Sequence, residues 1–328
     1  MTFAYIVTHG ARIYKRGERL LVESPEDEVL EDLEARRLDG IAMLNTVQVT
    51  TQALTELLEH GVELAILTQS GKLLGQLTPP LAKNIDLRKR QFEKERNSAF
   101  ALTTAKVIVD AKVRNQREVL VRFGQDEPGD QPEIAAAAAA MREFSPRIAE
   151  SPDLDHLRGL EGAAARTYWG VFGRLLKAEG VAFRGRLKRP APDPVNAVLS
   201  FGYVLLSSAL HSLLDGLGFD PFLGFFHVES YGRPSLALDL LEPFRAPVVD
   251  RFAVRVFNLK MLKPTDFEPD EQGGVRLRQE ALKVFFREYE KTLRGMEVRR
   301  RLREQAEGLR KVLMDEADCL EPYRWSAR

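Results

Sequence analysis

The sequence predicts an α+β protein, with a small, mostly β N-terminal domain over residues 1–80 and a larger all-α domain over residues 81–328. Short apolar runs separated by turn residues fill the first part, and long segments of helical period fill the second. Consecutive prolines at 79 and 80 mark the boundary, because proline resists both helix interiors and central strands. A chain of 328 residues also exceeds the usual size of one hydrophobic core.

The first eighty residues combine short strands with one helix. A helix is expected over 50–61, where leucines recur on one face and Gly61 supplies a stop. Residues 62–68 and 73–77 predict a hairpin that closes the domain through the turn between them. The remaining strands are expected over residues 3–7, 11–15, 19–23 and 41–49.

Long helical patterns dominate the rest of the chain. Residues 85–123 predict one or two long amphipathic helices with excess positive charge, followed by a polar loop over 124–133. The alanine-rich run over 134–144 is a strong helix former by intrinsic propensity. Further helices are expected to begin near Leu154, Pro194, Pro243 and Val275.

Residues 195–214 carry no charge and are long enough to span a bilayer. The run contains polar residues such as Asn196 and His211 and is closely flanked by aspartates, so a helix buried inside a helical domain fits better. The single cysteine, Cys319, cannot form an internal disulfide, which favours a reducing compartment. The start of the sequence lacks a signal-peptide pattern. We expect a soluble cytoplasmic protein with no membrane contact.

Charge is unevenly distributed although the net charge is zero. Residues 1–80 hold seven basic and twelve acidic residues, a balance of −5, which leaves +5 for the remainder. Residues 166–189 hold seven basic residues and one acid, and residues 276–311 hold twelve basic and six acidic residues. This pattern indicates a polyanion-facing part of the molecule, unless the clusters are simply solvated helix faces.

The segment 233–245, RPSLALDLLEPFR, places Asp239 and Glu242 in an otherwise apolar run. A buried ionised carboxylate costs several kcal/mol unless it is compensated, and residues three apart on a helix point the same way. Arg233 and Arg245 could pair with the two acids in a structural network. A bound cation would cancel the repulsion equally well, and the segment alone leaves both solutions open.

Two further residues suggest metal chemistry. Glu161 lies on an apolar helical stripe beside small residues, and His227 follows two phenylalanines. Taken singly, they resemble a glutamate near a helix start and a core histidine. One histidine with two or three carboxylates, however, makes a site for Mn²⁺ or Mg²⁺, and the imidazole favours Mn²⁺. Nearby arginines could then hold a phosphate. The sequence contains no Walker loop, Rossmann glycine pattern or nucleophile elbow.

Four segments occur in an order and spacing that resemble a known family. They are LEGAAARTYW at 160–169, RPAPDPVNAVLSFGYVLL at 189–206, GFDPFLGFFH at 218–227 and SLALDLLEPFR at 235–245. Together they are similar to the CRISPR-associated integrases of spacer acquisition, which are metal-dependent DNA endonucleases. The resemblance covers nearly the whole chain, including a small β domain before an all-α catalytic domain.

The resemblance implies specific roles for these residues. Glu161, His227 and Glu242 would be metal ligands, and Asp239 would be an auxiliary acid of the catalytic site; some members carry aspartate at the position of Glu242. Tyr168 and Arg245 match positions near the metal and DNA, and Arg233 and Arg166 are further candidates for holding DNA phosphates. The resemblance also implies homodimers formed through the β domains. Two such dimers would bracket a dimer of the small ferredoxin-like second adaptation protein.

The implied reaction joins DNA. The 3′-hydroxyl of a spacer-precursor duplex would attack a phosphodiester at the CRISPR repeat, assisted by the metal. A Mn²⁺-dependent, structure-specific nuclease acting in repair would use the same site. A non-catalytic DNA-binding scaffold with a buried ion network is an alternative of another class. A small-molecule metal hydrolase is more distant, because it leaves the basic clusters unexplained.

Overall fold

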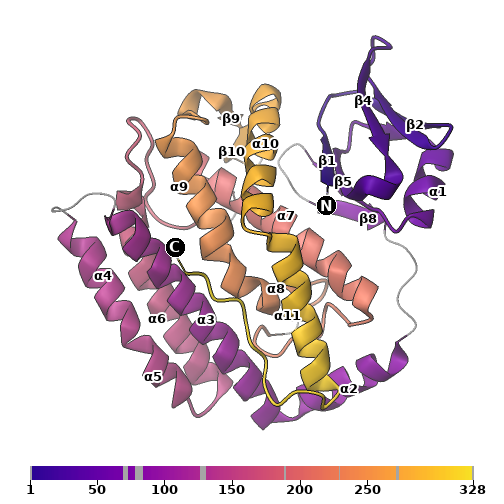
Figure 1. Ribbon diagram of the computed structural model, residues 1–328. Helices are drawn as coiled ribbons and strands as arrows, with labels where there is room; N and C mark the ends of the chain where they lie inside the picture. The colour runs from indigo at the N-terminus through magenta and orange to yellow at the C-terminus, as the bar shows by residue number, and fades with distance from the viewer. Residues whose placement is uncertain are drawn as a thin grey trace.

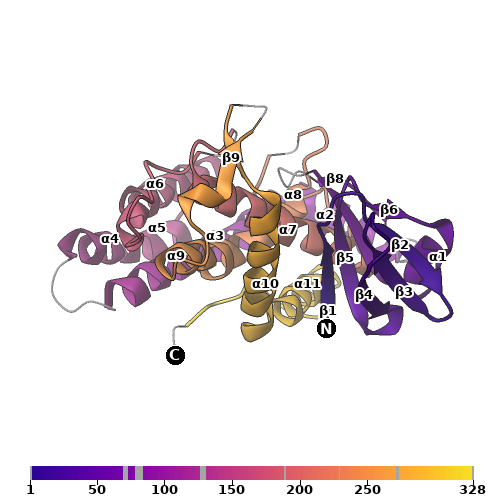
Figure 2. The ribbon, with the colours of Figure 1, turned by 90° about the horizontal axis from the view of Figure 1, so that it is seen from above.

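The computed structural model describes residues 2–68, 73–77, 84–125, 131–187, 190–228, 230–270 and 273–326. A β-rich N-terminal region lies beside a larger helical region (Figures 1 and 2). The predicted division into strands first and helices afterwards is thereby confirmed. The predicted boundary at Pro79 and Pro80 and the turn at 69–72 lie outside the described residues, so the split at residue 80 stays a prediction.

The first sheet of the N-terminal region faces the helices. Its order is β1-β5-β7-β8, with β1, β5 and β7 parallel and β8 antiparallel to β7. Tyr5 stacks on Phe286 with 4.3 Å between ring centroids, so this sheet shares the main apolar core with the helical region. Its strands are β1 (Thr2–Ile6), β5 (Leu38–Leu44), β7 (Glu63–Leu67) and β8 (Leu73–Leu77).

A second sheet, ordered β4-β3-β2-β6, completes this region together with helix α1 (Thr51–Glu59). Its strands are β2 (Arg12–Arg16), β3 (Arg19–Glu23), β4 (Val29–Glu34) and β6 (Gln48–Val49). Strand β4 was not predicted, because its sequence VLEDLE is acidic and mostly exposed. Its ladder with β3, and the ion pair of Arg19 with Glu34 at 2.8 Å, hold it at the sheet edge.

The segment 85–123, predicted to form one or two long helices, forms two. Helix α2 (Ile85–Arg96) and helix α3 (Ser98–Gln125) are separated at Asn97. The Asn97 side-chain oxygen accepts hydrogen bonds from the main-chain N–H groups of Ala99 and Phe100, both at 3.1 Å. This side-chain cap favours a new helix start over a continuous helix.

The predicted helix starts near Leu154 and Pro194 are confirmed. Asp153 and Asp193 are the N-caps, and each side chain accepts from the main-chain N–H three residues later. Helix α7 is the one helix among the described residues that is long and apolar enough to cross a bilayer. It packs in the main core, as expected for a central helix of a helical region. The helices of this part are α4 (Pro132–Arg142), α5 (Phe144–Ala149), α6 (Leu154–Phe172, continued by η2, Gly173–Leu175) and α7 (Pro194–Leu217).

The other two predicted helix starts are wrong. Pro243 lies inside α8 (Ser235–Phe244), and the chain continues as a π-helical segment, η3 (Arg245–Asp250), into α9 (Arg251–Asn258). A proline in a helix removes an N–H donor, and a π-helical turn is one way to accommodate it.

Val275 begins a strand rather than a helix. Strand β10 (Val275–Leu277) pairs antiparallel with β9 (Phe267–Pro269), so the second region is not purely α-helical. The next helix, α10, begins four residues later than Val275 and is followed by α11, which lies across the front of the molecule in Figure 1. These last two helices are α10 (Gln279–Gly295) and α11 (Val298–Leu313).

Candidate metal-dependent active site

Residues far apart in the sequence meet around the buried carboxylate of Glu242. Helix α3 contributes Lys112, α6 contributes Glu161, and the loop between α7 and α8 contributes His227. Glu242 comes from α8 together with Asp239. The site is therefore held by packed helices rather than by one flexible loop.

The Asp239 carboxylate is fully buried and fully engaged. Its Oδ2 accepts hydrogen bonds from the main-chain N–H groups of Phe225 and Phe226, at 2.7 and 2.9 Å. Its Oδ1 accepts from the main-chain N–H of His227 at 3.0 Å and lies 2.6 Å from His227 Nδ1. A Cβ atom at Gly224 would lie 2.6 Å from Asp239 Oδ2, so this close approach requires the glycine. Hydrogen bonding from the loop thus compensates one of the two acids of the apolar run.

Asp239 fixes the orientation of His227. With Nδ1–H donating to Asp239, the imidazole presents Nε2 toward Glu242 Oε1, 3.8 Å away. Such a carboxylate–histidine pair is the usual support of a metal-binding histidine. The geometry favours Asp239 as a positioning residue rather than a ligand, because both of its oxygens already accept hydrogen bonds.

The Asp239→Asn variant will separate this positioning role from simple packing. The amide presents N–H groups to buried N–H donors, and each unsatisfied buried donor costs about 1–3 kcal/mol. We expect a lower free energy of unfolding by urea and a roughly 10–100-fold loss of Mn²⁺ affinity, since His227 loses its support. Asp220→Asn, in the same loop, is the matched control. Mn²⁺ affinity unchanged in Asp239→Asn would contradict the positioning role.

Glu242 is compensated by two cations. Its side chain is 2% exposed, Lys112 Nζ lies 2.6 Å from Oε2, and Arg245 Nη1 lies 3.3 Å from Oε1. Burial opposes ionisation of Glu242, but the charges of Arg245 and Lys112 outweigh it and hold its pKa at about 2. Arg245 is thus one of the two arginines anticipated as partners of the acids. Arg233 lies half-buried before α8, where its main-chain N–H donates to Ser230.

Lys112 links the two carboxylates and is not among the site residues predicted from the sequence. Its Nζ lies 2.5 Å from Glu161 Oε1 as well as 2.6 Å from Glu242 Oε2. Burial lowers its pKa, but Glu242 and Glu161 more than offset this and raise it overall. The signal was present: Lys112 follows the buried residues Ile108 and Val109 by one helical turn, on the apolar face of α3.

The donor set fits a divalent cation. Among the described residues no group of three potential ligands is already arranged around an empty metal position. The oxygens of Glu161 and Glu242 nevertheless converge on one positive charge, the Lys112 ammonium. His227 Nε2 faces the Glu242 carboxylate. Carboxylate oxygens with one imidazole nitrogen suit Mn²⁺ or Mg²⁺. The chemistry of these donors is therefore compatible with the expected metal, at the position that the Lys112 ammonium occupies between the two glutamates.

Three of the four predicted DNA-contacting side chains are at least partly accessible, and Tyr168 is not. Arg166 is exposed on α6, whereas Arg233 and Arg245 are partly buried. The Tyr168 side chain is completely buried and its hydroxyl donates to Asp250 Oδ2 at 3.0 Å, so a DNA contact through Tyr168 stays a prediction. Its position on the buried face of α6 gives it a structural partner.

The buried Asp250 carboxylate accepts hydrogen bonds from the hydroxyl groups of Tyr168 and Tyr203. Burial raises the pKa of Asp250 to about 6, although both hydroxyl hydrogen bonds act to lower it. The neutral carboxyl is therefore favoured by folding. The stabilisation that the protonated Asp250 carboxyl contributes is fully present below about pH 3.8, the ordinary pKa of aspartate. This stabilisation is lost as the pH rises through about 6.

This linkage predicts an unusual pH dependence for Asp250→Asn, which cannot ionise. Relative to the unmodified protein, the variant should gain roughly 2–3 kcal/mol in free energy of unfolding between pH 4 and pH 7.5. Urea unfolding at the two pH values measures this difference. Asp318→Asn, an exposed carboxylate, should show no such gain. A gain of the opposite sign for Asp250→Asn would refute the assignment.

Curated relatives define the class of this protein. A CRISPR-associated endonuclease Cas1 from Rhodospirillum rubrum is 36% identical over 295 residues, covering 85% of this chain and 83% of that protein. One from Chlorobaculum tepidum is 33% identical over 290 residues, covering 87% and 84%. The chain is thus an enzyme of the CRISPR-associated nuclease class. The family model of CRISPR associated protein Cas1 matches residues 4–291, and the chain belongs to that family.

Solved structures share the whole fold. A casposase bound to an integration product superposes with a TM-score of 0.83 at 23% identity, covering 98% of this chain and 93% of that one. A CAS1 protein from Thermotoga maritima gives a TM-score of 0.82 at 22% identity, covering 100% of both chains. The β-rich region and the helical region therefore form a known arrangement. The resemblance drawn from the four sequence motifs is confirmed.

Proposed function

We propose that this chain is the integrase of CRISPR adaptation, which joins the 3′-hydroxyl of a spacer-precursor DNA to a phosphodiester at the CRISPR repeat. The observation that carries the proposal is the convergence of Glu161, Glu242 and His227 in a chain of the Cas1 family. Relatives of this chain are named endonucleases, and one structure of the same fold holds an integration product.

In this proposal Glu161, His227 and Glu242 hold Mn²⁺ or Mg²⁺, which when bound polarises the phosphoryl oxygen and stabilises charge on the attacked phosphate. Glu242 stays ionised throughout the physiological pH range, because its pKa lies at about 2. Asp239 keeps His227 Nε2 directed at the ligand position. Arg233 and the exposed Arg166 hold backbone phosphates, and such contacts weaken steeply with salt.

We further propose the assembly that the family resemblance implies. The ligands of this chain are double-stranded spacer-precursor DNA and the CRISPR repeat. Its partners are a second copy, through the β-rich region over residues 1–80, and the small ferredoxin-like second adaptation protein. Solved structures of the same fold include a Cas6-RT-Cas1–Cas2 complex and a Cas1–DNA complex, which support DNA and a Cas2-type partner. A cytoplasmic location remains part of the proposal.

A strand-transfer assay tests the function. A labelled spacer-precursor duplex, a CRISPR repeat target and Mn²⁺ should give joined half-site products that disappear when the metal is chelated. Released fragments without joined products would favour the repair-nuclease alternative. Unaltered DNA with no thermal stabilisation by Mn²⁺ would favour the non-catalytic scaffold and overturn the proposal.

A further inference from the structure

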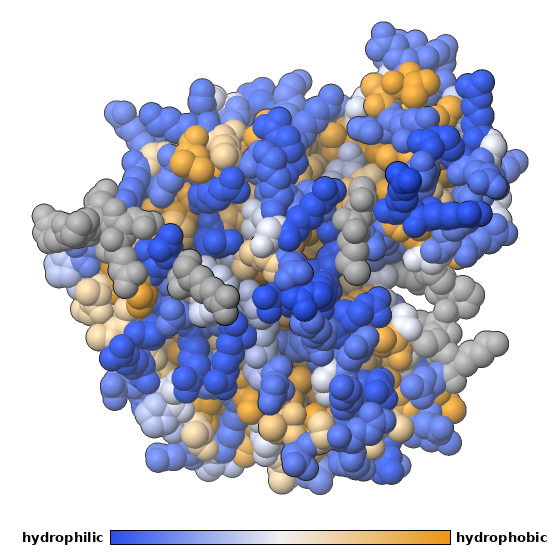
Figure 3. All heavy atoms as spheres, viewed as in Figure 1, coloured by the Kyte–Doolittle hydropathy of each residue, from blue (hydrophilic) through white to orange (hydrophobic). Residues whose placement is uncertain are grey.

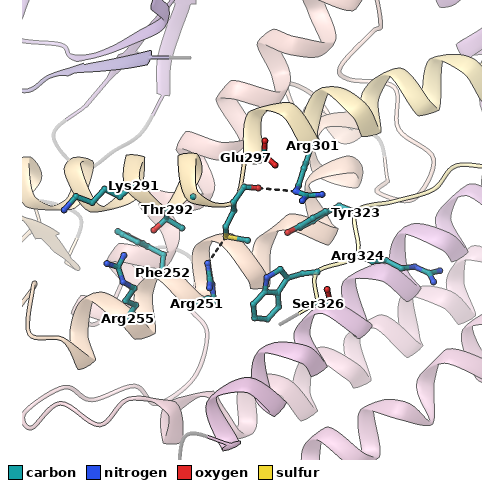
Figure 4. A pocket seen from close by; sticks show the side chains of 13 residues that line it. Arg251, Phe252, Arg255, Lys291, Thr292, Glu297, Arg301, Tyr323, Arg324 and Ser326 are labelled. Carbon is teal, nitrogen blue, oxygen red and sulfur yellow. Dashed lines mark hydrogen bonds between the residues drawn. The ribbon is translucent and has the colours of Figure 1, made fainter. Parts of the chain in front are cut away.

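A cavity of about 710 Å³ lies between α9, α10, α11 and the segment 323–326, away from the residues of the candidate site (Figure 4). Its volume lies within the range of pockets that hold small organic ligands. Its wall combines basic and aromatic side chains, with Glu297 as the one carboxylate among the described residues that line it. Glu297 is itself held by Arg300 at 2.6 Å. The surrounding face is largely hydrophilic (Figure 3).

Two arginines of this wall have no carboxylate within 4.0 Å in the described part of the chain. Arg251 donates to Pro247 O at 3.1 Å and contacts Met296 Sδ at 2.9 Å, and Arg301 donates to Met296 O at 3.2 Å. Both are half-buried. A partly desolvated guanidinium without a counter-charge is costly, and a bound anion relieves that cost.

The other cations of the cavity are less available. Arg255 and Lys291 both pair with Glu288, at 3.4 and 2.7 Å. Arg324 points away from the cavity in Figure 4, and its Nη2 lies 3.8 Å from Asp110 Oδ2 on α3. The uncompensated charge is therefore concentrated on Arg251 and Arg301. Burial lowers the pKa of Arg251, which agrees with the lack of a nearby anion.

Aromatic rings complete the wall beside these two arginines. The Arg251 guanidinium lies 5.2 Å from the centre of the Trp325 ring, and that of Arg301 lies 5.4 Å from the centre of the Tyr323 ring. Guanidinium groups recognise phosphate through paired N–H donors, and aromatic faces accept nucleobases. We name the cavity the arginine–tryptophan pocket, defined by Arg251, Arg301, Tyr323 and Trp325.

We propose that the arginine–tryptophan pocket binds the phosphate of a nucleotide, with Arg251 and Arg301 holding the phosphate and the base lying against the aromatic wall. The phosphate can belong to a single-stranded DNA segment or to a free mononucleotide, which present the same chemistry. The inference does not depend on the proposed strand transfer, because it rests on residues that take no part in the Glu161, His227 and Glu242 cluster.

Trp325 provides a direct reporter, since Trp169 is the only other tryptophan of the sequence. In a Trp169→Phe background, the full chain is titrated without divalent metal. The titrants are inorganic phosphate, thymidine monophosphate and a short oligothymidylate, and Trp325 fluorescence is recorded. Saturable quenching of Trp325 fluorescence by a nucleotide supports the proposed pocket. Quenching by the oligothymidylate alone identifies DNA as the source of the phosphate, and quenching by the monophosphate alone identifies a free nucleotide. No quenching by any of the three overturns the proposal.

Variants locate the binding. Arg251→Gln and Arg301→Gln should each weaken binding of the quenching titrant roughly 10-fold. With the oligothymidylate, each should also lower the salt slope by about 0.7, as expected for one lost single-strand phosphate contact. Arg251→Lys keeps the charge and should retain part of the affinity if the glutamine variant unfolds. Arg303→Gln, on the exposed side of α11 and paired with Glu307, is the control. Equal affinity in the three glutamine variants would overturn the proposal, whatever their strand-transfer activity.

Discussion

Glu242→Gln will reduce Mn²⁺-dependent strand transfer by at least about 100-fold. The substitution removes a negative oxygen of the proposed metal ligand Glu242, at the point where Lys112, Arg245 and His227 converge. Even partners outside the ligand set of a metal commonly contribute 10–100-fold to affinity or activity, so loss of a ligand costs no less. Half-site product formed per minute, measured with excess Mn²⁺, gives the ratio.

Stability must be measured in parallel with activity. Glutamine leaves two buried cations facing a neutral amide, and breaking a buried ion pair costs about 3–5 kcal/mol. The folded pKa of Glu242 lies below its ordinary value, so its stabilising contribution is present above about pH 4.5 and is lost as the pH falls toward 2. The variant should therefore be less stable than the unmodified protein at pH 7, and this difference should shrink toward pH 3.

Matched variants separate catalysis from folding. Glu242→Asp keeps the charge and should retain measurable strand transfer, in line with aspartate at this position in some family members. Glu307→Gln, at a partly exposed acid of α11 that lies outside the site, should change neither activity nor stability. A Glu242→Gln protein that is folded by circular dichroism and still joins DNA at the unmodified rate would remove Glu242 from the site.

The sequence identifies the acids and the histidine because they violate the apolar pattern around them. Asp239 and Glu242 stand out in a leucine-rich run, and the structure shows why they are tolerated: one is held by main-chain amides, the other by two cations. The partners of the amide-held acid could not be predicted. The pattern of side chains in a sequence does not indicate which main-chain N–H groups will donate to a given carboxylate. The close approach of Gly224 to Asp239 depends on tertiary packing.

Long-range partners explain the other misses. Lys112 lies on the apolar face of α3, but its two carboxylate partners are defined only when α3 packs against α6 and α8. Tyr168 fits a family position near DNA, and the partner of its buried hydroxyl is Asp250, 82 residues away. Strand β4 is acidic and strands β9 and β10 have only three residues each, so pairing with neighbouring strands decides them rather than local propensity. By contrast, the helices capped by Asp153 and Asp193 carry their start signals locally.

Lys112→Met should bind Mn²⁺ at least about 10-fold more tightly than the unmodified protein. The Lys112 ammonium lies between Glu161 and Glu242, so a cation held by both carboxylates competes with it for the same oxygens. The two carboxylates raise the pKa of Lys112, and the group therefore stays charged and cannot leave simply by losing a proton. Removing the ammonium removes that competition, and a 10-fold change corresponds to about 1.4 kcal/mol.

The same substitution should destabilise the metal-free protein, because Glu161 loses its lysine partner and Glu242 keeps only Arg245 as a counter-charge. Thermal stabilisation by saturating Mn²⁺ should accordingly be larger in Lys112→Met than in the unmodified protein, since a ligand that binds only the folded state raises its stability. Isothermal titration at pH 7 and pH 9 should show the same difference in affinity at both values. Lys106→Met is the control, because this lysine lies on the same helix and its ammonium donates to Ala149 O rather than to a carboxylate of the site. Weaker Mn²⁺ binding by Lys112→Met would mean that the lysine supports the metal-bound state, and competition for one cation position would then be wrong.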